Sequence, residues 1–361
     1  MGTGQEGTSG SETDGQQNQV LSFRRKFVYA TGTIGDSLPY NATSFYLFFY
    51  LTTVVGISPL DAGILVGLPA FFLFPLDPIA GVLSDRVRSR FGRRHIFLIT
   101  CGPFACACFF LRFYAPPGWD TSILFIYWFA VQLAYSVGAT LTMVSYTAMT
   151  AELSPSSSER AQIVSIQQGF GLVGTALGSA LTIPIVNALR GGRLGFAEMA
   201  GIYAVVMVAV FLSASAVTSR RQAPSEQSAV WKDTVVILRF RAFWFQSGIW
   251  FLISTVSTVV NALLIFYLMY VLVIPEMLPR VMLLVIIGGM ASLPLWNLLS
   301  SRLDKRRVIG LGAVVFAVVL TSLLFLSGSS LLLLWPLACF AGVGTVSLSF
   351  LRIAMMTDLI A

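Results

Sequence analysis

Residues 77–94 read DPIAGVLSDRVRSRFGRR and lie between two long runs of apolar side chains. The arginines are confined to this short segment, and each flanking run is long enough to cross a bilayer, which takes about 20 apolar residues per helix. Hydrophobic residues make up 56% of the 361 positions and charged residues 11%, whereas soluble domains carry about 25% charged residues. The sequence therefore predicts an all-α, polytopic membrane protein.

Working outward from this segment, ten apolar runs can be drawn along the chain. They are continuous rather than alternating, which indicates helices and not the strands of a barrel. Prolines inside or near many of the runs predict kinked or broken helices. The runs are 27–50, 60–83, 95–115, 121–148, 164–188, 196–218, 241–272, 279–301, 306–328 and 330–357, and the prolines are Pro39, Pro69, Pro75, Pro103, Pro184, Pro294 and Pro336.

The polar segments divide the chain. Residues 1–22 are rich in Gly, Ser, Thr and Gln, which is typical of a disordered tail. The polar, basic stretch 219–240 predicts a linker between a six-helix half, 23–218, and a four-helix half, 241–361. Most of the 23 Lys and Arg residues fall on one side when successive loops are placed on alternate sides. The positive-inside rule then predicts a cytoplasmic N-terminus, tail and linker.

The composition argues against several function classes. The net charge of +7 comes from short basic clusters between apolar runs, without the basic face that a nucleic-acid partner requires. The four cysteines lie inside apolar runs and only one histidine is present. No metal-ligand spacing or nucleophile–base pair is evident, so neither a metal site nor an enzyme is predicted.

Glycines in the fifth apolar run give a misleading motif. Gly169, Gly171 and Gly174 satisfy the dinucleotide-binding pattern, but no strand precedes them. Together with Gly178 they instead form a stripe of small residues, which predicts close packing of this helix on a neighbour.

The loop 77–94 resembles the signature loop of the major facilitator superfamily. Its longer form, with Asp-Pro at the start and Arg-Ser-Arg before Gly-Arg-Arg, resembles the glycoside–pentoside–hexuronide:cation symporter family. The stretch 151–155 (AELSP) followed by Glu159 and Arg160 is similar to a second segment of that family. The resemblance, which covers about 25–361, implies two pseudo-symmetric halves and twelve helices. With ten runs, the second half is expected to be incomplete, as in a truncated chain.

The resemblance also implies a conformational gate in the cytoplasmic loops. The carboxylate of Asp85 can meet an arginine or a helix N-terminus across the bundle. A plain positive-inside anchor is the alternative interpretation. The residues expected in the gate are Gly81, Asp85, Arg86, Gly92, Arg93, Glu152 and Arg160.

Carboxylates at membrane depth are costly, so a functional role is the default hypothesis. By resemblance, Asp36 is expected to contact the substrate and Asp77 to couple a cation. A hydrogen-bonded structural carboxylate is the alternative for Asp36, and a helix cap beside Pro78 is the alternative for Asp77. Leu73 and Thr142 stand where the family has further acids. A lone carboxylate is a poor sodium site but can carry a proton, which favours coupling to H⁺, or no coupling, over coupling to Na⁺.

These features predict a secondary carrier that moves a sugar or glycoside by alternating access. A monomer in the lipid bilayer is expected, with a small-molecule substrate and no cofactor except the coupling ion. The alternatives are a carrier of lysolipids or other amphipaths and a non-transporting sensor. The expected substrate contacts are Asp36, Tyr40, Thr142, Tyr146, Asn261 and Tyr267, and Gln132, Tyr135 and Gln167 are further candidates for a cavity wall.

Overall fold

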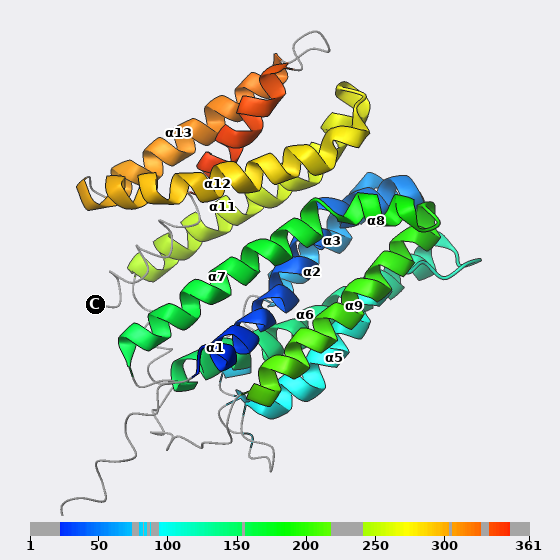
Figure 1. Cartoon of the computed structure of the whole chain (residues 1–361). Helices are drawn as coiled ribbons and strands as arrows, with labels where there is room; N and C mark the ends of the chain where they lie inside the picture. Colours follow the sequence, from blue (N-terminus) through cyan, green and yellow to red (C-terminus); the bar gives the residue numbers. More distant parts are fainter. Residues whose placement is uncertain are drawn as a thin grey trace, which may run out of the picture.

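The computed structural model describes residues 22–73, 79–81, 83–84, 87, 94–153, 156–217, 241–302, 305–325 and 332–346. Within these ranges the chain is helical and contains no strand, and each of the ten apolar runs contains a helix (Figure 1). Long apolar runs form helices because the backbone then satisfies its own hydrogen bonds without water. The predicted fold class is confirmed.

The first half of the chain forms the helices α1 to α9. Their bounds are α1 Phe23–Ala30, η2 Thr31–Thr33, α2 Ile34–Phe49, η3 Tyr50–Val55, α3 Pro59–Leu73, α5 His95–Arg112, α6 Thr121–Leu153, α7 Ser157–Ser179, α8 Thr182–Ala188 and α9 Gly192–Val217. The second half forms α11 Arg241–Phe266, η4 Tyr267–Val271, η5 Pro275–Met277, α12 Leu278–Arg302, α13 Lys305–Leu324 and a last helix, Leu334–Val346.

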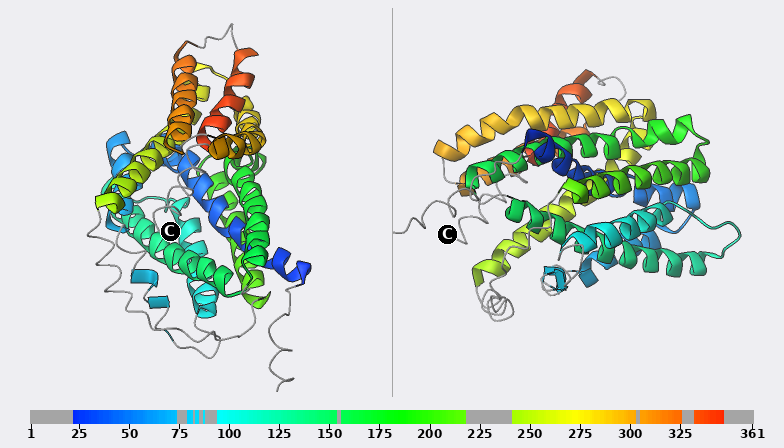
Figure 2. Two further views of the ribbon diagram at one scale, coloured as in Figure 1. Left: turned by 90° about the vertical axis from the view of Figure 1, so that its left-hand side faces the viewer. Right: turned by 60° about the horizontal axis from the view of Figure 1, so that its bottom comes forward.

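Four of the described helices are long and apolar enough to cross a membrane, namely those at 95–112, 121–150, 192–217 and 278–296. A fifth span is formed if α7 and α8, which are bent by 46° at the break between them, are taken together. The chain is therefore an integral, multi-pass membrane protein. The helices of the second half lie beside those of the first half in both views of Figure 2.

The first apolar run is not one regular helix. A 3-10 turn, η2, separates α1 from α2, and a π-helical segment, η3, follows α2 and ends at Gly56, which has a φ of 91°. Pro39 lies inside α2 without interrupting it. The irregular turns therefore do not coincide with the proline, contrary to the simplest expectation from the sequence. They bracket the segment of α2 that carries Asp36.

The glycine stripe of α7 packs against α2, as the sequence predicts. A Cβ atom added at Gly174 would lie 3.1 Å from the Leu38 nitrogen, and one added at Gly178 would lie 3.0 Å from the Ala42 nitrogen. The two backbones approach this closely only because neither glycine has a side chain. By contrast, a Cβ added at Gly169 meets no atom within 4 Å.

Replacing Gly178 tests this packing. Gly178→Ala should lower the free energy of unfolding by about 1–3 kcal/mol, because the added methyl group overpacks the contact with α2. Gly169→Ala is the matched control, since it gains the same helix propensity in open space. Thermal unfolding of both variants in detergent measures the difference. Equal midpoints for the two variants would contradict close packing at Gly178.

Candidate functional site

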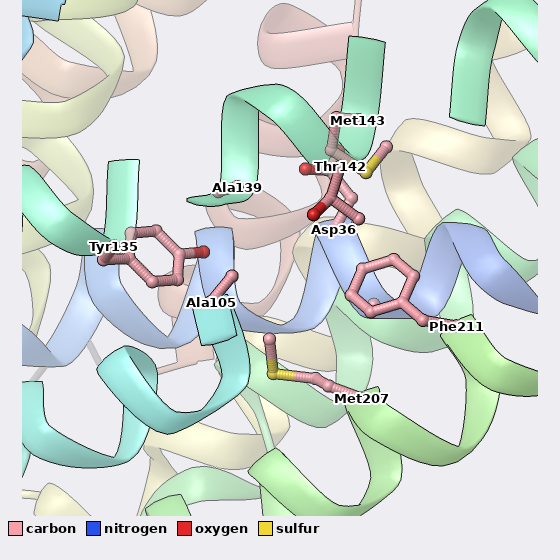
Figure 3. Close-up of a pocket in the computed structure, with 9 residues that line it drawn as sticks. Asp36, Ala105, Tyr135, Ala139, Thr142, Met143, Met207 and Phe211 are labelled. Atoms are coloured by element: carbon pink, nitrogen blue, oxygen red, sulfur yellow. The ribbon is translucent and has the colours of Figure 1, made fainter. Parts of the chain in front are cut away.

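A pocket lies inside the first half of the molecule, around Asp36 (Figure 3). It is built by α2, α5, α6 and α9. Its lining is mostly apolar. The lining residues are Gly35, Asp36, Ala105, Tyr135, Ala139, Thr142, Met143, Met207 and Phe211.

Asp36 is the carboxylate of this pocket. It lies deep in the bundle, yet its side chain keeps an exposed surface. A side chain that is deep in the bundle and still exposed faces an internal space rather than the outer surface of the protein. Within the described part of the chain, Asp36 makes no side-chain hydrogen bond and no ion pair. Such a carboxylate is costly at membrane depth unless it has a function.

Tyr135 of α6 faces the same pocket and connects it to a buried cation. The guanidinium carbon of Arg112 lies 4.1 Å from the centre of the Tyr135 ring, a cation–π contact. Arg112 is only 5% exposed, and its backbone carbonyl accepts a hydrogen bond of 3.1 Å from the Trp128 indole. Arg112 was not predicted from the sequence, because an isolated arginine at a helix end gives no pattern.

Tyr146 is the centre of a buried hydrogen-bond network rather than an open contact in this conformation. Its hydroxyl donates to the Tyr29 carbonyl at 2.9 Å and accepts from Gln167 at 3.0 Å. The Thr33 hydroxyl lies 3.2 Å from the same oxygen. The rings of Tyr29 and Tyr146 stack with their centres 4.8 Å apart. This network ties α1, η2, α6 and α7 together.

Thr142 and Tyr40, two other expected substrate contacts in the first half, differ in their exposure. Thr142 lines the pocket, but it is fully buried and its hydroxyl donates to the Gly138 carbonyl at 2.7 Å. Tyr40 lies one helical turn after Asp36 on α2 and is 57% exposed. Only Tyr40 of this pair therefore offers a large accessible surface.

The two expected contacts on the second half are hydrogen-bonded within the protein. The Asn261 amide of α11 donates to the Ser44 hydroxyl of α2 at 3.2 Å, which links the two halves. The Tyr267 hydroxyl donates to the Leu323 carbonyl of α13 at 2.6 Å. The structure thus brings Asp36 and Thr142 into one pocket and places Asn261 and Tyr267 outside its lining.

The predicted coupling and gate residues lie mainly outside the described residues. This applies to Asp77, Asp85, Arg86, Gly92 and Arg93, and to the side chain of Glu152. Gly81 ends a short described helical stretch, 79–81. Arg160 is half-buried in the first turn of α7.

An ion pair that the sequence did not reveal lies beside Arg160. The Lys26 ammonium is 2.8 Å from the Glu159 carboxylate, and both side chains are buried. Ser156 caps α7 by accepting the Glu159 backbone N–H, a favourable N-terminal arrangement. The pair fixes α1 against the start of α7, within one half.

A family model described as "MFS/sugar transport protein" matches residues 28–361. Three curated relatives are an uncharacterised symporter of Synechocystis, a sphingosine-1-phosphate transporter of Xenopus tropicalis and an isoprimeverose transporter of Lactiplantibacillus pentosus. They are 32%, 28% and 26% identical over 54%, 50% and 56% of this chain. The matched regions span 37%, 35% and 43% of the relatives' own lengths.

A solved structure gives the same fold. The xylose transporter XylE of Escherichia coli, in a partially occluded, inward-open conformation, aligns with a TM-score of 0.60 at 15% identity. The alignment covers 94% of this chain and 88% of that one. The likeness at this identity concerns the fold.

The Tyr146 network gives a testable expectation. Tyr146→Phe should lower the free energy of unfolding by about 1–3 kcal/mol, because it leaves buried polar partners unsatisfied. Tyr114→Phe is the control, since that hydroxyl makes no hydrogen bond within the described residues. Unfolding midpoints in detergent report the difference. A Tyr146→Phe variant as stable as the control would mean that the network does not hold the helices together.

Proposed function

Because the chain belongs to the MFS/sugar transport protein family, we propose that it forms part of a secondary carrier that moves a sugar or glycoside across a membrane. The family consists of transporters rather than enzymes. Relatives named as an isoprimeverose transporter and a putative glycoside/cation symporter support the sugar class. The carrier works by alternating access, in which two halves rock around a central site.

The observation that carries the proposal is the way the halves meet. Besides the bond between Asn261 and Ser44, Phe266 of α11 contacts Phe48 and Phe49 of α2, with ring centres 5.8 and 5.7 Å apart. These contacts lie in the C-terminal part of α2. Asp36 and Tyr40 lie in its N-terminal part and are exposed. Contact between the halves at one end of α2, with the exposed Tyr40 ring nearer its other end, is what one state of such a carrier requires.

Ile265 of α11 is 1% exposed where this helix packs against the C-terminal part of α2. By the predicted orientation, this end of α2 faces outward and its N-terminal end faces the cytoplasm.

The sugar assignment agrees with the groups that line this region. Sugar hydroxyls are bound by carboxylates, amides and hydroxyls, and the apolar face of a sugar ring stacks on aromatic rings. The exposed Tyr40 ring, one helical turn after Asp36 on α2, offers a stacking surface. Coupling through Asp77 stays a prediction from the sequence.

A lipid-like amphipath is the second candidate substrate. The pocket around Asp36 is lined by Met143, Met207 and Phe211, which suit an apolar chain better than a polyol. The relative named as a sphingosine-1-phosphate transporter supports the same class. A sensor that binds without transporting is the third interpretation, which a net-transport assay separates from both carriers.

Uptake into proteoliposomes tests the assignment directly. The complete gene product should accumulate at least one member of a panel of labelled pentoses, hexoses and glycosides when a proton gradient is imposed. Collapse of the gradient with an ionophore is the control. Transport of labelled lysophosphatidylcholine without any sugar would replace the sugar with the amphipath. Neither activity in folded protein would favour the sensor.

Cross-linking tests the seam between the halves. In a background without the four native cysteines, the double variant Ser44→Cys, Asn261→Cys should lose uptake on oxidation and recover it on reduction. The reason is that a bond at the seam prevents the halves from separating there. The two single-cysteine variants, treated identically, are the controls. Full uptake by the oxidised, cross-linked double variant would show that this seam does not open during transport.

A further inference from the structure

We propose that Arg112 is a positioning residue for ligand binding, which fixes the ring of Tyr135 so that the Tyr135 hydroxyl meets a sugar hydroxyl in the pocket. The inference rests on the proposed function and adds two residues to it. Tyr135 touches the ligand, and Arg112 acts only through Tyr135. The ligand chemistry is that of a polyol, because a phenol hydroxyl can donate a hydrogen bond to a sugar oxygen or accept one from a sugar hydroxyl.

The ring of Tyr135 contacts two side chains from the last turn of α5. The guanidinium carbon of Arg112 lies 4.1 Å from the centre of the ring, and the centre of the Phe109 ring lies 6.4 Å from it. Residues three positions apart lie on one face of a helix, so both contacts come from the same face of α5. Phe109 and Arg112 are both buried. The two contacts therefore restrict how the Tyr135 ring can turn.

The end of α5 is fixed against α6, and this fixes Arg112. The last carbonyl groups of an α-helix have no partner within the helix. Here the Tyr127 hydroxyl donates to the Leu111 carbonyl at 2.9 Å, and the Trp128 indole donates to the Arg112 carbonyl at 3.1 Å. Trp128 and Tyr135 are seven positions apart and lie on one face of α6. The Arg112 side chain therefore lies along this face, from the first to the second.

The charge of Arg112 has no carboxylate partner within the described residues. Its Nε atom is enclosed and makes no hydrogen bond there. A cation in the last turn of a helix is favoured by the helix dipole, which is the simplest structural role. However, side chains point back over the preceding turn, and this guanidinium lies over an aromatic ring. A buried cation without a carboxylate is costly at membrane depth, so a function is the default hypothesis.

Tyr135 connects this arrangement to the pocket. The lining residues with an oxygen-bearing side chain are Asp36, Tyr135 and Thr142. The Thr142 hydroxyl already donates to the Gly138 carbonyl at 2.7 Å. Figure 3 shows the Tyr135 hydroxyl pointing into the pocket from the wall that α6 forms. A small rotation of the ring moves this hydroxyl away from a bound ligand, so the affinity depends on the group that fixes the ring.

Transport kinetics test the two roles. The probe is the labelled pentose, hexose or glycoside that the complete gene product takes up best in proteoliposomes. Tyr135→Phe keeps the ring and removes the hydroxyl, so KM should rise roughly two- to tenfold with the maximal rate unchanged. Arg112→Met removes the charge and should raise KM by a similar factor. Arg112→Lys should recover part of the affinity, because an ammonium group can also lie over the ring.

Arg190→Met is the matched control. Arg190 is exposed, lies just after α8 and pairs with Glu198 at 3.1 Å. Its replacement also removes one positive charge, but from a side chain that does not line the pocket. KM should stay at the value of the unmodified protein.

The double variant separates positioning from an independent effect. If Arg112 acts through the Tyr135 hydroxyl, adding Arg112→Met to Tyr135→Phe should raise KM no further, whereas independent effects multiply. Unfolding midpoints of the same proteins in detergent report any purely structural contribution. Multiplied KM values, or an unchanged KM in folded Arg112→Met protein, would overturn the proposal. If Arg112→Met does not fold, the same comparison with Arg112→Lys decides.

The failure of this inference differs from the failure of the proposed function. Sugar uptake with independent effects of the two substitutions refutes the role of Arg112 and leaves the carrier standing. No uptake of any sugar by the folded, unmodified protein refutes the sugar carrier, and the role of Arg112 with it.

Discussion

The first half of this protein depends on how closely α2 and α7 approach each other. Gly174 and Gly178 let the two backbones come within a distance that any side chain would prevent. Without water at this depth, association of helices relies on such packing rather than on the hydrophobic effect. Because α2 is fixed along α7, the face of α2 that carries Asp36 is turned toward α5, α6 and α9, where the pocket forms.

Most of the polar side chains described in the same half are used in hydrogen bonds that stabilise the fold. Tyr29, Tyr146 and Gln167 satisfy one another, and Thr142 is satisfied by its own helix. These groups are fully used, as buried polar groups must be at membrane depth. The Asp36 carboxylate makes no such bond within the described residues, and the same holds for the buried Tyr50 hydroxyl and the Gln132 side-chain oxygen. Asp36 differs from these two groups in carrying a charge at membrane depth.

The helices and the close packing of α7 could be predicted from the sequence, because apolar runs and the glycine stripe are local patterns. The sequence was insufficient for the roles of single polar residues. Tyr146 was expected to contact substrate, yet its hydroxyl bonds to the Tyr29 carbonyl, which is 117 positions away in the chain. No local pattern reports that pairing. The breaks at 31–33 and 50–55 were missed for a similar reason, since they do not coincide with the proline of the run.

The contacts between the halves suit the alternating access proposed above. A hydrogen bond contributes a net of about 0.5–1.5 kcal/mol, and an aromatic pair adds about 0.5–1.5 kcal/mol beyond its area burial. The bond from Asn261 to Ser44 and each contact of Phe266 therefore contribute individually less than the roughly 5.5 kcal/mol needed to reverse a 1:99 equilibrium. Differential binding of a substrate and an ion can supply that energy. The network around Tyr146 lies wholly within one half, so it holds α1, η2, α6 and α7 together independently of the contacts between the halves.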